Sequence, residues 1–358
     1  MNGVRVILAI AALLAGPASA DTVDAIVRRD MNRDRIPGVA LLVMRAGRVE
    51  RSAGYGLANV EHGVPVTRAT MFQSGSLGKH FTAAAVLLLA ERGRLSLDDR
   101  IDKYLPAGPP GWEAITIRQL LEHTSGIRDS EDGGEIFDLR HEYSDAELLR
   151  VLQSYPLDFA PGSRWKYNNS GYILAGIVVT RVAGMFYGDF LARELFQPLA
   201  MHTARIISDS DIVPNRAAGY VRTAGGIRNQ DFASAALNAT ADGSLYLSLE
   251  DWSTWVAALD TRALLSPASW DAFWGRTRTS AGELVEHAYC WDYASVGGHV
   301  LLEFDGTWQG FRTAIARDPA TRLTVVVLAN LAEARPERTA RAVLAAVAGW
   351  RAPTADQE

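Results

Sequence analysis

The sequence has very little of what several protein classes require. Only one of its 358 residues, Cys290, is a cysteine, so no disulfide can form within the chain. The one long hydrophobic run lies at the extreme N-terminus, which predicts no bundle of membrane spans. Lys and Arg number 36 against 41 Asp and Glu, a net charge of −5 that provides no basic surface for nucleic acid. The composition is that of a globular protein, and we expect neither a nucleic-acid partner nor an integral membrane protein.

The N-terminal hydrophobic run has the pattern of a cleavable secretory signal. Arg5 precedes a nearly continuous apolar stretch from Val6 to Ala15, and Ala18-Ser19-Ala20 matches a cleavage site. A membrane anchor would need about 20 apolar residues, and this run is shorter. We therefore expect residues 1–20 to be removed, and the mature protein to reach the periplasm or the extracellular space without a membrane span.

The hydrophobic pattern predicts strands toward both ends of the chain and helices between them. Runs at 38–44 and 49–55 flank a turn, which is typical of a β-hairpin. Further strands are expected at 288–294, 299–303, 311–318 and 323–329, and helices at 23–32, 81–89, 117–122, 145–154, 171–182, 187–195, 252–259 and 336–350. The predicted fold class is α+β, an antiparallel sheet built from both chain ends, flanked by helices, with an inserted helical region. We assign 21–75 and 245–358 to the sheet region and 76–244 to the mainly helical region of one catalytic unit.

The segment Ser76-Leu-Gly-Lys79 places a hydroxyl and an amine three residues apart at the start of the most apolar predicted helix. Residues at this spacing are neighbours on a helix. Burial lowers the pKa of a lysine, and a neutral amine can accept the proton of a serine. Ser163 and Lys166 have the same spacing but follow a Pro-Gly turn, away from a helix N-terminus that would favour a developing anion. We therefore predict that Ser76 is the nucleophile.

Tyr167 and Asn169 form a second candidate group. A phenol beside a serine–lysine pair can carry a proton to the leaving group, and a carboxamide two residues on can hold a substrate carbonyl and Lys79. The alternative is a polar turn in which Asn169 or Ser170 caps the following helix. These residues alone leave both interpretations open.

Six short motifs follow one another along the chain. They are Ser76-x-x-Lys79, Leu120-Leu-Glu-His-Thr-Ser-Gly-Ile127, Tyr167-x-Asn169, Pro198-Leu-Ala-Met-His-Thr203, Ala239-Thr-Ala-Asp-Gly-Ser244 and Gly306-Thr-Trp-Gln-Gly-Phe311. In this order they resemble, over residues 25–345, the serine hydrolases related to class C β-lactamases, a family that also includes D-alanyl-D-alanine carboxypeptidases, D-amino-acid peptidases and β-lactamase-like esterases. The resemblance implies a β-lactamase/transpeptidase-like, penicillin-binding fold with the site between the sheet and the helical region.

The resemblance also implies a role for each matching residue. Ser76 would be acylated, Lys79 and Tyr167 would share general-base and general-acid catalysis, and Asn169 would orient the substrate. Which of the two takes the serine proton stays open. The oxyanion hole would be formed by the backbone N–H groups of Ser76 and of Thr307, which follows Gly306. Phe304, Gly306, Thr307 and Trp308 are expected to bind substrate, Trp308 because it lies beside that donor. His123 looks like part of a structural loop near the site, and no metal or organic cofactor is implied.

The third family motif differs in this chain. Phe304-Asp305-Gly306 stands where relatives have Lys-Thr-Gly or His-x-Gly, so the cation or imidazole is absent. A β-lactam or a peptide C-terminus brings a carboxylate, which a cationic partner would hold by a charge-assisted hydrogen bond. Phe304 cannot make that bond, although esterases of this family tolerate an aromatic residue here. His299 or Arg312 are alternative sources of charge, and Phe304 could also be an inward-packed strand residue.

These motifs predict a serine hydrolase that cleaves a small ester or amide through an acyl-enzyme on Ser76. The alternatives are a D-amino-acid-specific peptidase or carboxypeptidase acting on cell-wall peptides, a β-lactamase, and a non-catalytic relative that binds a ligand. No metal site is expected, because Cys290 and His287 provide only two of the four ligands typical of zinc. We interpret Cys290 as a buried strand residue, and Trp252, Trp255, Trp270 and Trp274 as packing residues.

Overall fold

The computed structural model describes residues 20–130, 137–206, 211–231 and 233–350. Residues 1–19, on which almost all of the predicted signal peptide falls, lie outside this range, so cleavage and export stay predictions. Within the described part of the chain, no helix taken singly is both long and apolar enough to cross a membrane. One pair, Asn169–Ala183 with Tyr187–Phe196, meets the length and composition criteria jointly but is bent by 73°.

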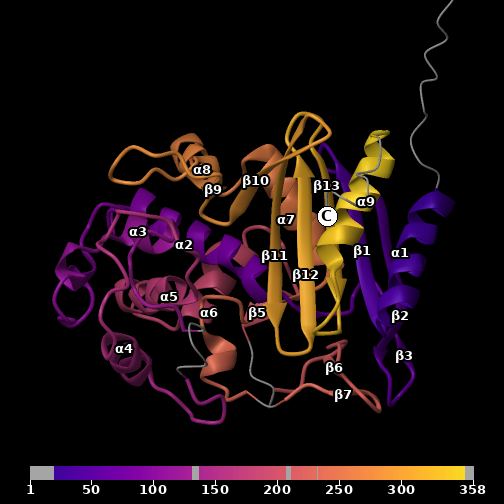
Figure 1. Ribbon diagram of the computed structural model, residues 1–358, viewed down its shortest axis with the longest axis horizontal. Coiled ribbons are helices and arrows are strands. Elements are labelled where there is room, and N and C mark those ends of the chain that lie inside the picture. The colour runs from indigo at the N-terminus through magenta and orange to yellow at the C-terminus, as the bar shows by residue number, and fades with distance from the viewer. Residues whose placement is uncertain (1–19, 131–136, 207–210, 232, 351–358) are drawn as a thin grey trace, which may run out of the picture.

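An antiparallel sheet of eight strands forms the centre of the molecule (Figure 1), in the order β3-β2-β1-β13-β12-β11-β10-β9. The first and last thirds of the chain meet in its middle, where β1 pairs with β13 and Leu42 lies opposite Val326. This confirms the predicted α+β class with a sheet drawn from both chain ends. The strands are β1 Gly38–Arg45, β2 Arg48–Asn59, β3 Val64–Pro65, β9 His287–Ala288, β10 Trp291–Val296, β11 His299–Trp308, β12 Phe311–Asp318 and β13 Leu323–Ala329.

Two layers of helices cover this sheet because its central strands are apolar on both faces. Helices α1 Ala20–Asp34 and α9 Pro336–Ala348 pack on one face, where Val27 and Leu344 share a core with Val325. Helices α2 Lys79–Glu91 and α7 Leu249–Thr261 belong to the larger core on the other face. Figure 1 shows α1 and α9 on one side of the sheet and the helical region on the other.

Some elements lie outside the ranges that the hydrophobic pattern predicted. Helix α8, where Trp270 and Trp274 were expected in a helical segment without bounds, follows Ser266, whose side chain accepts from the backbone N–H of Ser269, and Pro267 occupies its first turn. The hairpin β6–β7 was missed because its strands are short and mostly exposed. The remaining described elements are β4 Phe72–Gln73, η1 Gly75–Gly78, η2 Ile101–Lys103, η3 Trp112–Ala114, α3 Ile117–Leu121, α4 Asp145–Gln153, α5 Asn169–Ala183, α6 Tyr187–Leu191, η4 Ala192–Phe196, β5 Arg205–Ile206, β6 Tyr220–Thr223, β7 Gly226–Asn229, η5 Leu237–Ala239, β8 Leu245–Leu247 and α8 Pro267–Trp274.

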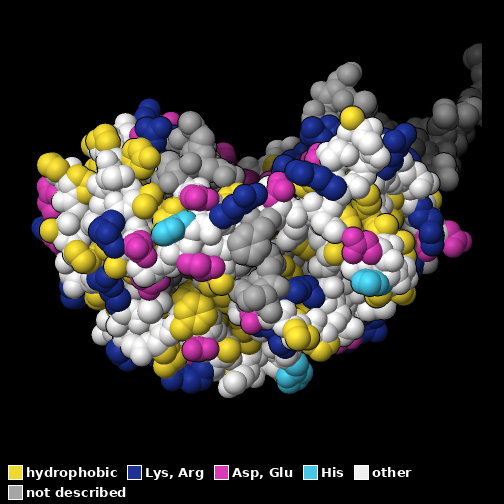
Figure 2. Space-filling model, turned by 90° about the horizontal axis from the view of Figure 1, so that it is seen from below, with side chains coloured by type: hydrophobic (Ala, Val, Ile, Leu, Met, Phe, Trp, Pro, Cys, Tyr) yellow, Lys and Arg dark blue, Asp and Glu magenta, His cyan; other side chains and the backbone are white. Residues whose placement is uncertain are grey.

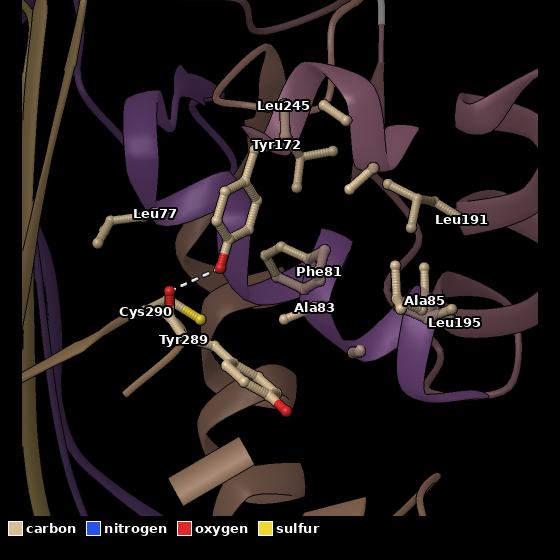
Figure 3. Packing of buried hydrophobic residues seen from close by; sticks show 14 of the residues in the cluster. Leu77, Phe81, Ala83, Ala85, Tyr172, Leu191, Leu195, Leu245, Tyr289 and Cys290 are labelled. Carbon is tan, nitrogen blue, oxygen red and sulfur yellow. Dashed lines mark hydrogen bonds between the residues drawn. The ribbon is translucent and has the colours of Figure 1, made fainter. Parts of the chain in front are cut away.

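Helix α2 is the most enclosed of the described helices, as its apolar sequence predicted. Every residue from 79 to 89 is buried. In Figure 3 Tyr172 reaches from α5 past Phe81, and its hydroxyl donates to the backbone oxygen of Tyr289 at 2.6 Å. Cys290 is buried as expected but lies in the turn between β9 and β10, not in a strand. Trp252, Trp255 and Trp270 are fully buried, and Trp274 stacks on Trp291.

The surface carries no single-sign charge pattern on the face seen in Figure 2. Acidic and basic side chains are interspersed over the described part of that face. This distribution agrees with the near balance of charges in the sequence. It offers no extended basic area of the kind that binds nucleic acid.

Candidate active site

Ser76 lies in the 3₁₀ turn η1, which is pressed against strand β11. Gly75 has φ +53°, and a Cβ built there would come within 2.5 Å of the backbone N of Thr307. A Cβ on Gly306 would come within 2.9 Å of the backbone N of Ser76. The two backbone N–H groups expected to form an oxyanion hole are therefore brought to adjoining positions by contacts that only glycine permits. Gly306, predicted to bind substrate, packs against η1 and is absent from the described residues lining the pocket.

The turn changes one detail of the sequence prediction. Ser76 does not occupy the first turn of the α-helix, because α2 begins only at Lys79. The 3₁₀ turn leads directly into α2, so Ser76 and Lys79 still share a face. The hydroxyl of Thr313 on β12 donates to the backbone oxygen of Ser74 at 2.6 Å and ties the turn to the sheet.

Four predicted side chains meet around the Ser76 hydroxyl. Its Oγ lies 2.6 Å from the hydroxyl of Tyr167 and 3.1 Å from Nζ of Lys79. Nζ also lies 2.7 Å from Oδ1 of Asn169. Nucleophile and proton acceptors are thus within hydrogen-bond reach of each other, which is the geometry that a serine–lysine–tyrosine mechanism needs.

The surroundings of Lys79 suit an amine that faces the serine. The side chain is fully buried, and Nζ donates to Oδ1 of Asn169 and, at 2.6 Å, to the backbone oxygen of Asp242. Both oxygens can only accept. An ammonium group would donate its third hydrogen to Ser76 Oγ, whereas a neutral amine would keep a lone pair that can accept the Ser76 proton. The ring of Tyr167 covers the amine, with Nζ 5.1 Å from the ring centroid.

The residues beside Asn169 settle the alternative of a helix cap. The N-cap of α5 is Asn168, whose Oδ1 accepts from the backbone N–H of Gly171 at 2.6 Å. Asn169 and Ser170, which we considered as caps, do not hold this position. The Asn169 side chain is free for Lys79, and its backbone N–H donates to Oδ2 of Asp129.

The ring of His123 packs against the ring of Tyr167. Its ring centroid lies 4.7 Å from that of Tyr167, and its Nδ1 accepts from the backbone N–H of Asn168 at 3.0 Å. Burial lowers the pKa of His123 well below its ordinary value, and His287 and Lys79 act in the same direction. The ring is therefore neutral and holds the Tyr167 segment in place, as the predicted structural loop would.

A pocket of about 310 Å³ opens above Ser76. Phe304 is in its wall and is also packed, at 5% exposure, with its ring 6.3 Å from that of Tyr167. Phe304 is therefore both a residue of the pocket wall and an inward-packed strand residue. The residues that line the pocket are Ser76, Trp165, Tyr167, Asn169, Asp242, Asp292, Phe304, Asp305, Thr307 and Trp308.

The ionisable side chains that line this pocket are mainly acidic. Asp242, Asp292 and Asp305 line it, and its described lining contains no Lys, Arg or His. Burial, and then the neighbouring carboxylate of Glu337, raise the pKa of Asp305 above its ordinary value, and Asp292 adds to this effect. A substrate carboxylate brought into the pocket would meet the same repulsion.

Two suggested substitutes for the missing cation lie elsewhere. His299 stacks on Trp350, with ring centroids 4.0 Å apart, and Nε of Arg312 donates to the backbone oxygen of Ala332. Neither is among the described residues that line the pocket, although the charge of Arg312 acts on Asp305, which does line it. The second Ser-x-x-Lys pair is also apart from the site: Ser163 is exposed and Lys166 bonds to Asp158.

Sequence reasoning missed the part played by Asp242. It belongs to the quoted motif 239–244, but its carbonyl contact with Lys79 and its place in the pocket depend on how that loop meets α2. Across the described ranges, no three His, Cys, Asp or Glu residues gather as metal ligands would.

Comparison with known proteins gives consistent matches. A family model described as Beta-lactamase matches residues 23–349. "Penicillin-binding protein 4*" of Bacillus subtilis is 26% identical over 312 residues, which cover 82% of this chain and 68% of that protein. The chain spans about two thirds of the length of the curated relatives it matches, 63–68%.

Solved structures show the same fold. A penicillin-binding protein from Bacillus halodurans has a TM-score of 0.77 and 26% identity, covering 91% of this chain and 98% of that one. A D-amino acid amidase from Ochrobactrum anthropi SV3, solved with L-phenylalanine amide, has a TM-score of 0.75 and 22% identity, covering 87% and 91%. The second likeness is evidence for the fold alone.

Proposed function

This chain belongs to the Beta-lactamase family, and we propose that it is a serine hydrolase that cleaves a small ester or amide through an acyl-enzyme on Ser76. The observation that carries the proposal is the contact of the Ser76 hydroxyl with both Lys79 and Tyr167 at the floor of an open pocket. The same proposal includes export to the periplasm or beyond, which rests on the N-terminal sequence.

The proposed reaction has two steps. Ser76 Oγ loses its proton to Lys79 or Tyr167 and attacks the substrate carbonyl, and the negative charge on the carbonyl oxygen is stabilised by the N–H groups of Ser76 and Thr307. The C–O or C–N bond to the leaving group breaks, and that group takes a proton from the tyrosine–lysine pair. Water then attacks the Ser76 ester by the reverse proton path, which releases the acid and restores the serine.

The charge of the pocket favours substrates without a carboxylate near the scissile bond. Asp292 and Asp305 line it where a cation would be needed to hold a carboxylate. β-Lactamase and D-alanyl-D-alanine carboxypeptidase activities are therefore the less favoured proposals. A D-amino-acid amidase or peptidase is the second candidate, because an amidase of this fold is known. Its distinguishing result would be cleavage of D-Ala-D-Ala peptides with no ester hydrolysis.

The first experiment is the intact mass of the protein after incubation with a fluorophosphonate, which captures activated serines. We expect one adduct on wild type and on Ser163→Ala, and none on Ser76→Ala. Ser163→Ala is the matched control, because it removes the serine of the other Ser-x-x-Lys pair. An adduct on Ser76→Ala would contradict the assignment of Ser76 as the nucleophile. No adduct on either protein would favour a non-catalytic ligand-binding protein.

A further inference from the structure

The carboxyl group of Asp242 is buried beside Lys79, and one of its two oxygens accepts no hydrogen bond from the described residues. The residue is 8% exposed, and its Oδ1 has no hydrogen-bond partner among the described residues. Its backbone oxygen, by contrast, accepts from Lys79. A buried carboxylate without a partner is costly, and such groups in folded proteins are normally paired with a donor or a cation.

Two cavities meet at this residue. The first is the pocket above Ser76, and the second, of about 280 Å³, has apolar walls that include Phe137, Leu139, Ile173 and Leu237. Asp242, Thr307 and Trp308 line both cavities. An acyl group bound at Ser76 could thus place one substituent against the carboxylate and another in the apolar cavity.

We propose that Asp242 binds the protonated amino group of an aminoacyl substrate and that the second cavity holds its apolar side chain. The α-carbon of an aminoacyl group lies one bond from the carbonyl attacked by Ser76 and carries both an ammonium group and a side chain. A charge-assisted hydrogen bond from that ammonium would satisfy Asp242, and the other carboxylates of the pocket, Asp292 and Asp305, add attraction for a cation. This inference rests on the proposed function and narrows its substrate class to esters or amides of apolar amino acids.

The test compares two esters that differ only in the amino group, leucine methyl ester in both enantiomers and methyl 4-methylpentanoate. Hydrolysis is followed in a pH-stat at about pH 6, where an α-amino group is protonated. We expect wild type to show a higher kcat/KM for one leucine enantiomer than for the ester that lacks the amine. In Asp242→Asn the ratio of the two kcat/KM values should fall about 10- to 100-fold, the usual effect of losing a hydrogen bond to a charged group.

The matched control is Asp305→Asn, which removes a carboxylate from the same pocket but from strand β11. Because Asp305 adds only attraction for the cation and not the proposed hydrogen bond, its ratio should fall less than that of Asp242→Asn. An Asp242→Asn ratio equal to that of wild type would overturn the inference, as would a wild-type ratio at or below one. Where Asp242→Asn does not fold, the two leucine enantiomers decide the matter, because they have equal intrinsic reactivity: equal kcat/KM values for both in wild type would overturn the inference.

The two levels of proposal fail in different ways. If the fluorophosphonate labels Ser76 and both esters are cleaved equally, Asp242 does not bind an amine, while the serine hydrolase mechanism stands. If Ser76 is not labelled and neither ester is cleaved, both proposals are wrong. The role of the apolar cavity is tested independently by filling it with a larger side chain. Leu237→Trp should lower kcat/KM for leucine methyl ester more than for alanine methyl ester.

Discussion

Replacing Gly306 by alanine should separate the catalytic turn from strand β11. The new Cβ would lie 2.3 Å from the backbone oxygen of Ser74 and 2.9 Å from the backbone N of Ser76, where ordinary contacts begin at 3.4 Å. Both neighbours are backbone atoms and cannot rotate away. Relief therefore requires the turn or the strand to move by about 1 Å, and a displacement of about 1 Å at a catalytic group can lower a rate about 100-fold.

We expect Gly306→Ala to lower kcat/KM for a methyl ester about 100-fold, equivalent to about 2.7 kcal/mol of barrier. Overpacking should also lower the free energy of unfolding by about 1–3 kcal/mol. Gly225→Ala is the control, since the nearest atom to its Cβ, Thr223 Oγ1, is 4.0 Å away. The assay is ester hydrolysis beside urea unfolding. A folded Gly306→Ala protein with kcat/KM within threefold of wild type would refute the reasoning.

Three further changes probe other parts of the structure. Tyr167→Phe removes the hydroxyl 2.6 Å from Ser76 Oγ and should lower kcat about 10²- to 10⁴-fold with little change in KM; a kcat within threefold would contradict its role in proton transfer. Burial raises the pKa of Glu122 from 4.5 to about 7, so the folded state holds this proton more tightly and stability falls as pH rises through that interval. In urea unfolding, the Glu122→Gln protein should be more stable than wild type by up to ~3 kcal/mol at about pH 8. At about pH 4.5 the two proteins should have nearly the same stability. Equal stabilities at both pH values would contradict this expectation. Arg317 and Asp260 form a buried ion pair, with side chains 6% and 1% exposed. In urea unfolding, Arg317→Met should lower the free energy of unfolding by about 3–5 kcal/mol, and adding Asp260→Leu should restore most of that loss. Additive losses in the double variant would show that the two residues are not coupled.

The sequence predicts the fold class and the serine–lysine spacing because both depend on local pattern. The segment that forms α2 is apolar on all sides, a pattern that predicts a buried helix. Ser76 and Lys79 are neighbours in any helical turn because they are three residues apart. Asn169 and its neighbours were ambiguous from the same kind of reasoning. Only the approach of α5 to α2 shows that Asn168 caps the helix while Asn169 contacts Lys79.

Features that depend on distant segments were not predictable. Strand β11 was expected to end at residue 303, yet it continues to Trp308, because pairing with β12 carries it through Phe304. The polar sequence of 305–307 gives no such indication. Asp242 acquires its position from the loop that reaches Lys79, and its contact with two cavities follows from packing that no single segment encodes.

The pairing of β1 with β13 has a consequence for the timing of synthesis. During translation Ser76, Lys79, Tyr167 and Asn169 are all present before β11 is made, and β12 and β13, which connect β11 to β1 in the sheet, are made later still. A nascent chain would hold the reactive side chains without the Thr307 N–H group, so it could not stabilise the oxyanion. Such late contacts between distant segments also slow folding. The enzyme we propose would therefore stay inactive until β11, β12 and β13 have been made.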